Sequence, residues 1–277
     1  MSKKNMDIFV AMHKEGSIPT NDSIYKFVQA GAALNKKINN VLYDNIGDNI
    51  SKLNPYYCEL TVLYWGWKNS DAEIKGLCHY RRFLSNSRIN FEKRLYLTEN
   101  QIKDALKDND IILGEPTYYQ YKKNMDTYIA GGCGKEEDLV ILRDVLNEFY
   151  PEYINAYDKV MMSYKMSYCN MLIASNHIYN AYTEWLFSVL KKLEPRINIS
   201  DRVGNQKRVY GYLAERLLNV WVMKNMLKIK YYPIVKIEDR ISNKYRVKCF
   251  LDNIGYYSTL QNIKEALLFK INNLCKK

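Results

Sequence analysis

Asp7-Ile-Phe-Val-Ala-Met12 is the stretch that decides the fold, because it is a short apolar run that is closed by the polar residues His13-Lys-Glu-Gly16. A run of this length bounded by a turn signal is typical of a buried strand. The stretch therefore predicts a first strand inside the domain and a loop that begins where the strand ends.

Further patterns of both kinds follow along the chain. Short strand patterns lie at 41–43, 73–79, 110–114, 168–174 and 231–237. Helical patterns lie at 57–68, 98–107, 135–149, 152–162, 177–193 and 208–224. Residues 117–134 are polar and aromatic, which predicts a loop near a site. Strands that alternate with helices predict an α/β fold with a mostly parallel central sheet flanked by helices and a helical C-terminal portion.

Two of the helical patterns carry start signals. Thr98 stands where an N-cap is expected, and Gln101 occupies the position of the reciprocal partner in a capping box. Ser51 and Asn54 are suited to cap the helix that precedes the strand at 73–79.

The end of the chain carries a separate amphipathic pattern. Between Leu260 and Leu274 the apolar residues fall on one helical face, and lysines lie off or beyond it. Such a helix can lie on an anionic bilayer, and it can equally pack on the domain, so both interpretations stay open. We expect one domain over residues 1–240 and a C-terminal extension over residues 241–277.

The composition limits the partners. Apolar residues make up 47% of the 277 residues, which is enough for a sizeable core, and the formal net charge is +11. Such a charge attracts nucleic acid, anionic lipid or phosphorylated substrates. The positive charge is spread along the chain, and no basic-aromatic nucleic-acid motif occurs, so we expect no nucleic-acid partner.

Cysteine usage and hydropathy bear on the compartment. The six cysteines contain no C-x-x-C pair and are expected to be free thiols of a reducing compartment. The first residues show no signal-peptide pattern, and no apolar stretch approaches the roughly 20 residues that span a bilayer. We expect a cytoplasmic protein that is at most peripheral on the inner face of the plasma membrane.

Polar clusters stand at the ends of three predicted strands. In an open α/β sheet, ligands bind outside the carboxyl ends of the strands. The pattern predicts one crevice that gathers Lys14, Asp48, Asn49, His79, Arg81 and Arg82. Two adjacent arginines suit a diphosphate, because guanidinium groups match phosphate oxygens and keep their charge. The alternative is that one arginine of the pair binds a surface carboxylate.

Three stretches carry a resemblance to a known family. They are Asp48-Asn-Ile-Ser51, Gly76-Leu-Cys-His-Tyr-Arg-Arg-Phe83 and Arg208-Val-Tyr-Gly-Tyr-Leu-Ala-Glu-Arg-Leu-Leu-Asn-Val-Trp221. From about Asp7 to about Ile237 the chain resembles bacterial GT-A-type glycosyltransferases of capsular and exopolysaccharide synthesis. Some members of that family are assigned as galactosyl- or galactofuranosyltransferases that use a UDP-sugar.

The resemblance implies the substrates and the binding residues. It implies a UDP-sugar donor carrying galactofuranose or galactose, and a saccharide acceptor linked to polyprenyl diphosphate. It also implies a nucleotide-sugar site at the first strand and the His79–Arg82 strand end. The residues that we assign to nucleotide-sugar binding are His13, Lys14, Asp48, Asn49, Ser51, His79, Tyr80 and Arg208.

The resemblance does not decide whether the site binds a metal ion, so this has to be argued from the residues of this sequence. Most GT-A enzymes carry a D-x-D motif that binds Mn²⁺ or Mg²⁺ at the end of a strand where this chain has His79-Tyr-Arg-Arg82. Asp71/Glu73 and Asp108/Asp110 look like D-x-D, but both pairs precede their strands and should lie at the opposite edge of the sheet. We therefore expect no metal site, with a metal-dependent transferase using Asp108/Asp110 as the alternative.

The catalytic roles follow from the charge that develops during transfer. Fixed cations stabilise a departing diphosphate more in the transition state than in the ground state, and we assign this role to Arg81 and Arg82. An inverting transferase, which we favour, also needs a base. We assign Glu215, because the resemblance implies a carboxylate at a comparable place in many inverting GT-A enzymes. The alternatives are that Glu215 forms an ion pair with Arg208 or Arg216, or that Asp201 or Glu59 is the base.

Some side chains and some functions stay ambiguous in the sequence. Tyr168, Asn170 and Trp185 are candidates for a sugar pocket, although a tryptophan on an amphipathic helix is more often core. A non-catalytic basic binding module, or an assembly factor in a polysaccharide complex, is the remaining alternative to an enzyme.

Overall fold

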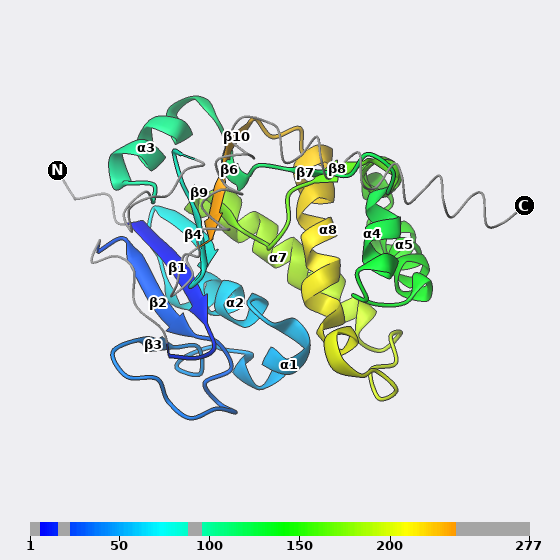
Figure 1. The fold of residues 1–277 in the computed structure, drawn as a ribbon, viewed down its shortest axis with the longest axis horizontal. Helices are drawn as coiled ribbons and strands as arrows, with labels where there is room; N and C mark the ends of the chain where they lie inside the picture. The colour runs from blue at the N-terminus through cyan, green and yellow to red at the C-terminus, as the bar shows by residue number, and fades with distance from the viewer. Residues whose placement is uncertain (1–5, 16–22, 88–95, 237–277) are drawn as a thin grey trace, which may run out of the picture.

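The computed structural model describes residues 6–15, 23–87 and 96–236, and it has an α/β fold (Figure 1). The strands of the central sheet gather on one side of the molecule, and helices α4, α5 and α8 lie on the other. The C-terminal amphipathic pattern at 260–274 lies outside the described residues.

The central sheet is mixed and mostly parallel, as the sequence predicts. Its strands follow the order β10-β6-β9-β4-β1-β2-β3, and β5 and β11 extend from β4. β1 pairs in parallel with β2 and β4, and β6 pairs in parallel with β10, whereas β9 is antiparallel to β4 and β6. The strands span Met6–Met12 (β1), Tyr25–Gln29 (β2), Leu42–Tyr43 (β3), Ile74–His79 (β4), Arg82–Leu84 (β5), Ile111–Gly114 (β6), Leu172–Ser175 (β9), Ile229–Tyr232 (β10) and Ile234–Lys236 (β11).

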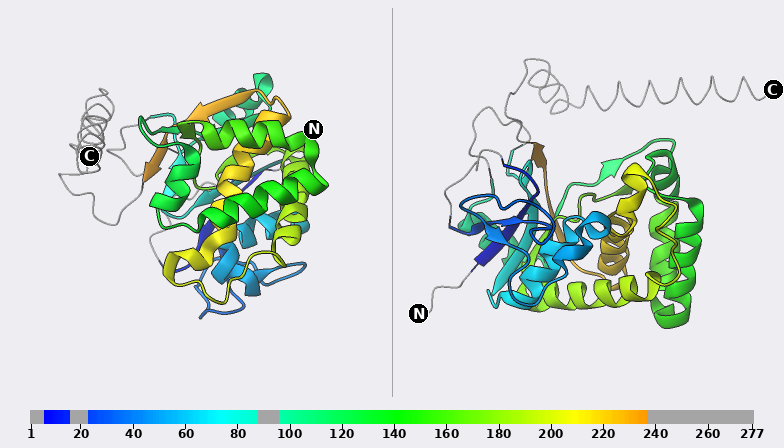
Figure 2. Two further views of the ribbon diagram at one scale, coloured as in Figure 1. Left: turned by 90° about the vertical axis from the view of Figure 1, so that its right-hand side faces the viewer. Right: turned by 90° about the horizontal axis from the view of Figure 1, so that it is seen from below.

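The helices cover both faces of this sheet. α2 and α7 pack on one face, and α3 packs near β6 and β9 on the other (Figure 2). The α-helices span Asn54–Tyr57 (α1), Leu60–Asn69 (α2), Glu99–Asp108 (α3), Asn124–Ala130 (α4), Glu136–Phe149 (α5), Ile154–Met162 (α6), Asn176–Leu193 (α7) and Val209–Lys224 (α8). Short 3-10 helices span Ser51–Leu53 (η1), Pro151–Tyr153 (η2) and Gly204–Arg208 (η3).

Alternate side chains of β1 enter two separate cores. Phe9 packs in the larger core with the helices of one face, whereas Ile8 and Val10 pack in the smaller core of the other face. Successive side chains of a strand point to opposite faces, so a strand that is apolar at every position must be covered on both sides. The apolar run at the start of the chain therefore forms an interior strand of the sheet, between β4 and β2.

Several local predictions are confirmed and several are wrong. The capping box at Thr98 and Gln101 is present at the start of α3. Strand β2 escaped prediction, and the strand predicted at 41–43 is a short outer strand. The helix predicted at 57–68 is interrupted at Cys58, which has a φ of 52°. The loop predicted at 117–134 contains α4 and the strand β7 (Thr117–Tyr118), which pairs with β8 (Lys165–Met166).

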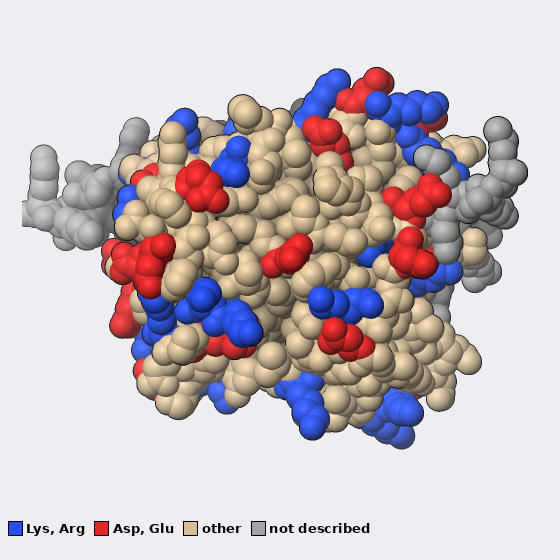
Figure 3. Space-filling view, turned by 180° about the vertical axis from the view of Figure 1, so that it is seen from behind, with Lys and Arg blue, Asp and Glu red and all other residues tan. Residues whose placement is uncertain are grey.

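The four cysteines in the described part of the chain are free thiols, of which Cys78 is buried and the others are half-buried. Cys249 and Cys275 lie outside that part. Across the face seen in Figure 3, basic and acidic side chains lie side by side. Within the described residues, no helix is both long enough and apolar enough to span a membrane.

A fully buried carboxylate, Asp44, fixes the loop after β2. Its two oxygens accept hydrogen bonds from the backbone N–H groups of Gly31 (2.8 Å) and Ala32 (2.9 Å). They also accept the hydroxyls of Ser51 and Thr61, both at 2.6 Å. Gly31 has a φ of 68°, which favours glycine. One carboxylate thus joins the end of β2 to η1 and α2.

We predict that Asp44→Ala lowers the free energy of unfolding by roughly 3 kcal/mol or more, because it leaves several buried donors without an acceptor. Urea denaturation followed by circular dichroism measures the change. Asp48→Ala is the matched control in the same loop, since Asp48 is exposed, and it should cost less than about 0.5 kcal/mol. Equal losses in the two variants would contradict this account of Asp44.

Candidate active site

An open cleft of about 580 Å³ lies where β1 and β4 end. Residues that directly follow these strands form one side, and residues of α1, η3 and α8 form the other. Of the sequence-predicted site residues, the cleft brings together His13, His79, Tyr80, Arg81, Arg82, Arg208 and Glu215. These residues come from parts of the chain that are up to about 200 positions apart, so the cleft depends on the tertiary fold.

The register of β1 and β4 sets the strand side of the cleft. Ala11 lies opposite His79, and the backbone N–H of Tyr80 donates to the carbonyl of Ala11 at 3.1 Å. The rings of His13 and Tyr80 therefore meet edge to face, with centroids 5.2 Å apart. The guanidinium of Arg81 lies 5.0 Å from the centroid of the Tyr80 ring. Two strand ends thus place an imidazole and a guanidinium around one aromatic ring.

Arg82 is held by strands on both sides. It is the first residue of β5, where it pairs with His79 of β4 and with Lys236 of β11. Nε2 of His79 is 2.7 Å from the carbonyl oxygen of Cys169, which ties the end of β4 to the segment before β9. The Arg81–Arg82 turn is therefore a short hairpin whose backbone is fixed on each side.

Arg208 brings a third guanidinium from the opposite side. It is the last residue of η3, and its Nε donates to Sγ of Cys58 at 2.9 Å. Its guanidinium lies 5.4 Å from the centroid of the Tyr212 ring. Burial raises the pKa of the Cys58 thiol to about 11, so the sulfur is neutral near pH 7 and does not compensate the charge of Arg208.

The surroundings of His13 favour its neutral form. Burial of the ring in the cleft lowers its pKa below the usual 6.5, and the positive charges of Arg81 and Lys14 lower it further. A neutral imidazole offers one donor and one acceptor near pH 7. The permanent charges of the cleft therefore belong to the arginines.

Glu215 is the carboxylate that α8 places in the cleft. Its side chain is 14% exposed, and its Oε1 accepts the backbone N–H of Cys169 at 2.8 Å. Burial raises its pKa to about 7, while the nearby charge of Arg216 lowers it. A carboxylate with a pKa near neutral can both accept and release a proton at physiological pH.

Glu59 is the other carboxylate that lines the cleft. Its Oε1 accepts the side-chain amide of Asn170 at 2.8 Å, and the same nitrogen donates to the carbonyl of Gly211 at 3.0 Å. Glu59 therefore remains the alternative base. Asp201 does not line the cleft, because its carboxylate binds Lys135 at 2.9 Å on the surface.

Several predicted binding residues lie outside the lining of this cleft. Asp48 accepts the hydroxyl of Tyr64 at 3.1 Å, and the side chain of Asn49 donates to the carbonyl of Gly47 at 2.8 Å. Ser51 binds Asp44, as described above. Lys14 is exposed directly beyond His13 and acts on the cleft through its charge.

The cleft also contains residues that the sequence did not single out. They are Asn35, Asn54, Pro55, Cys58, Cys169 and Tyr212. Tyr212 could have been found, because it precedes Glu215 by three positions and therefore shares its helix face. No local sequence pattern indicates that Cys58 and Cys169 lie close to α8. Trp185, a candidate for the sugar pocket, instead stacks in the core on Tyr153, with ring centroids 4.5 Å apart.

The carboxylates that line the cleft, and that could hold a divalent metal there, are those of Glu59 and Glu215, and each has one oxygen bound by a protein donor. The strand end carries arginines. Asp71 and Glu73 precede β4, and Asp110 precedes β6 and accepts the backbone N–H of Lys228 at 2.7 Å, so both pairs lie away from the cleft. Over the ranges that the structure describes, no cluster of three or more histidine, cysteine, aspartate or glutamate residues is arranged to hold a metal ion.

Comparison with solved structures shows a glycosyltransferase-like fold. The chain is similar to the apo structure of the bifunctional glycosyltransferase WbbM, with a TM-score of 0.77 and 30% sequence identity. The match covers 85% of this chain and 46% of the other, so the chain spans about half the length of that structure. No curated protein matches the chain.

A protein-family model matches most of the chain. It is described as "Domain of unknown function (DUF4422)", and it matches residues 7–226, which include most of β1, the Arg81–Arg82 turn and all of α8. Because the match extends over far more than half of the residues, this chain belongs to the DUF4422 family.

Proposed function

We propose that this chain is a glycosyltransferase that moves a hexosyl group from a UDP-sugar to a saccharide acceptor in bacterial surface polysaccharide synthesis. The observation that carries the proposal is that Arg81, Arg82 and Glu215 line the same cleft of a glycosyltransferase-like fold. Galactofuranose or galactose as the donor sugar, and a polyprenyl-diphosphate-linked acceptor, follow from the family resemblance of the sequence.

The arginines are suited to the departing UDP. As the bond between the anomeric carbon and the diphosphate oxygen breaks, the bonding electrons stay with UDP and negative charge grows on its oxygens. Guanidinium groups that are already in place stabilise this charge without reorganisation. Arg81 and Arg82 stand at the strand end for this role, and Arg208 and the neutral His13 contact the same diphosphate or its ribose.

Glu215 is suited to the acceptor. Its carboxylate takes the proton of the attacking hydroxyl while the acceptor oxygen forms a bond to the anomeric carbon. Attack from the side opposite UDP inverts the configuration. The two walls of the cleft suit this division, because Arg81 and Arg82 lie at the strand end and Glu215 projects from α8. We propose that no metal ion takes part.

A screen of UDP-sugars tests the function. We expect one UDP-hexose to raise the melting temperature by mass action and to be transferred or slowly hydrolysed, which release of UDP measures. The rate should be the same in EDTA and in Mn²⁺. A strict requirement for Mn²⁺ would favour a metal-dependent transferase. A chain that binds no UDP-sugar in calorimetry would instead be a binding or assembly protein.

We predict that Arg81→Ala and Arg82→Ala each reduce turnover roughly 100-fold or more, as loss of one electrostatic donor does in other enzymes. Initial rates at saturating donor measure the change. Arg143→Ala is the matched control, because Arg143 forms an exposed ion pair with Asp158 on the surface, and it should retain full turnover. Full activity in both cleft variants would remove the arginines from the mechanism.

We predict that Glu215→Gln abolishes transfer but preserves folding and UDP binding, whereas Glu59→Gln retains transfer. The base acts when ionised, and its pKa is about 7, so turnover should rise with pH through 7 and fall about tenfold per unit well below it. Steady-state rates from pH 5 to 9 give the profile. The reverse result, an inactive Glu59→Gln and an active Glu215→Gln, would transfer the role to Glu59.

A further inference from the structure

A buried arginine lies directly behind Glu215. Arg216 is 1% exposed and does not line the cleft. Its Nη1 is 3.6 Å from Oε2 of Glu215 and donates to the carbonyl of Tyr212 at 2.9 Å. Its guanidinium also lies 4.8 Å from the centroid of the Tyr128 ring. The charge is therefore fixed in place on the side of Glu215 that faces away from the substrate space.

Arg216 also contacts the segment that holds the other oxygen of Glu215. Nη2 of Arg216 donates to the hydroxyl of Thr127 at 3.4 Å, and this oxygen is 3.2 Å from the hydroxyl of Tyr168. The next residue, Cys169, donates its backbone N–H to Oε1 of Glu215. Oε2 of the carboxylate thus lies near the guanidinium without a hydrogen bond to it, and Oε1 is bound by the backbone group that follows Tyr168.

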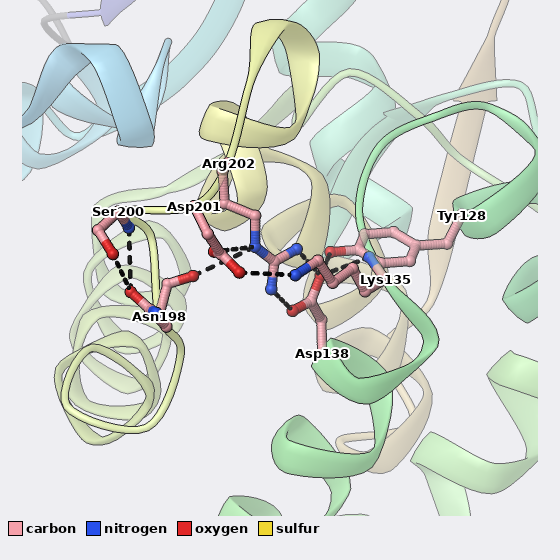
Figure 4. Close-up of polar contacts among 7 residues, drawn as sticks. All are labelled: Tyr128, Lys135, Asp138, Asn198, Ser200, Asp201 and Arg202. Atoms are coloured by element: carbon pink, nitrogen blue, oxygen red, sulfur yellow. Dashed lines mark hydrogen bonds and ion pairs between the residues drawn. The ribbon is translucent and has the colours of Figure 1, made fainter.

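Arg202 shows what a purely structural buried arginine looks like in this chain. It is 3% exposed and forms a two-pronged ion pair with Asp138, with Nη1 2.9 Å from Oδ2 (Figure 4). Asp138 also accepts the hydroxyl of Tyr128 and the backbone N–H of Lys135, both at 2.8 Å. Asp138 thus accepts four hydrogen bonds, two of them from Arg202, so this carboxylate is matched to Arg202.

Arg216 has no carboxylate in the described part of the chain that accepts two hydrogen bonds from its guanidinium. Its buried Nε has no hydrogen-bond partner among the described residues, and the carboxylate beside it is Glu215 at a distance longer than a hydrogen bond. Arg202 forms a fork of two hydrogen bonds with its carboxylate, which is the strong arrangement for such a pair, and Arg216 does not. The charge of Arg216 therefore lies near Glu215 without occupying Oε2 by a hydrogen bond.

We propose that Arg216 is a positioning residue that keeps the buried Glu215 ionised and aimed into the cleft. This inference rests on the proposed role of Glu215 as the base. Burial alone would keep the carboxylate protonated and unable to accept a proton. The positive charge at 3.6 Å offsets that burial without occupying the substrate space.

Some groups near Glu215 lower its pKa and others raise it. From α8, Arg216 lowers its pKa, and from η3 the more distant Arg208 lowers it as well. The charge of Glu59 at the start of α2 raises it. The thiols of Cys58, Cys133 and Cys169 and the phenols of Tyr168 and Tyr212 also face this region, and burial keeps them neutral near pH 7. Arg216 is the charge that lowers the pKa of Glu215 most.

The test compares a neutral and a charged substitution. In Arg216→Gln we expect the acidic limb of the pH–rate profile to move up by about 1–3 units, as removal of a nearby opposite charge predicts. Turnover at pH 7 should fall roughly fivefold or more and recover at higher pH. Arg216→Lys keeps the charge, so its limb should move by less than about 0.5 unit. Equal shifts in the two variants would assign Arg216 to structure only and overturn the inference.

Arg202→Lys controls for general loss of stability. It disturbs the other buried arginine and should lower the melting temperature while leaving the acidic limb where it is. If the acidic limb of the pH–rate profile moves as far in Arg202→Lys as in Arg216→Gln, the inference is overturned.

Carbon-13 NMR of glutamate-labelled protein follows Glu215 without substrate, with its resonance assigned by its loss in Glu215→Gln. A titration near pH 7 in the wild-type chain supports the inference, and a pKa above about 9 overturns it even if Arg216→Gln does not fold. A chain that transfers no sugar, but in which Arg216→Gln raises the pKa of Glu215, would overturn the proposed function and leave the coupling of the two residues intact.

Discussion

The cleft depends on the parallel pairing of β1 with β4. Because Ala11 lies opposite His79, both strands must leave the sheet at the same edge and at the same level. The hydrogen bond from the Tyr80 N–H to the Ala11 carbonyl continues the pairing past the end of β4. The residues that follow β1 and those that follow β4 are therefore neighbours although about 67 positions separate them. A register shift of one residue would exchange the faces of every following side chain and disperse the group.

The opposite wall depends on how closely α8 approaches α1. A Cβ on Gly211 would lie 3.4 Å from Sγ of Cys58, which is the near limit of an ordinary contact, so the two elements approach closely here. Cys58 itself has a φ of 52°, which bends the chain between α1 and α2 and directs Glu59 toward the cleft. Because α8 is seated here, Arg208, Tyr212 and Glu215 face the strand ends. The shape of this wall is thus set by a glycine at position 211 and by the bend at Cys58.

The strand side of the cleft could be predicted from the sequence, because apolar runs mark buried strands and the residues after them must share an edge. The loop after β2 could not. The sequence suggested that the strand at 41–43 would deliver Asp48, Asn49 and Ser51 to the crevice, but β2 at 25–29 is the true neighbour of β1. The short β3 lies outside it, and Asp44 turns inward to bind backbone N–H groups. Glu215 entered through family resemblance, since no local periodicity links α8 to a strand end 130 positions earlier.

Arg202 and Arg216 are both buried, and their contacts show how a charged cleft can lie next to an apolar core. A buried charge is tolerated when a partner and hydrogen bonds compensate it, and Asp138 does this for Arg202 by accepting four donors. Arg216 is compensated less completely, by a carbonyl, a hydroxyl, an aromatic face and a carboxylate that also faces the cleft. The buried charge of Arg216 is therefore stabilised when the carboxylate of Glu215 is ionised, and the ionised carboxylate is stabilised by Arg216. Under the proposed function, Glu215 is protonated once in each catalytic cycle. The buried cation of Arg216 then lacks a negative partner, and the pair is less stable. The lower stability of the protonated state favours release of the proton to solvent, which returns Glu215 to its ionised form.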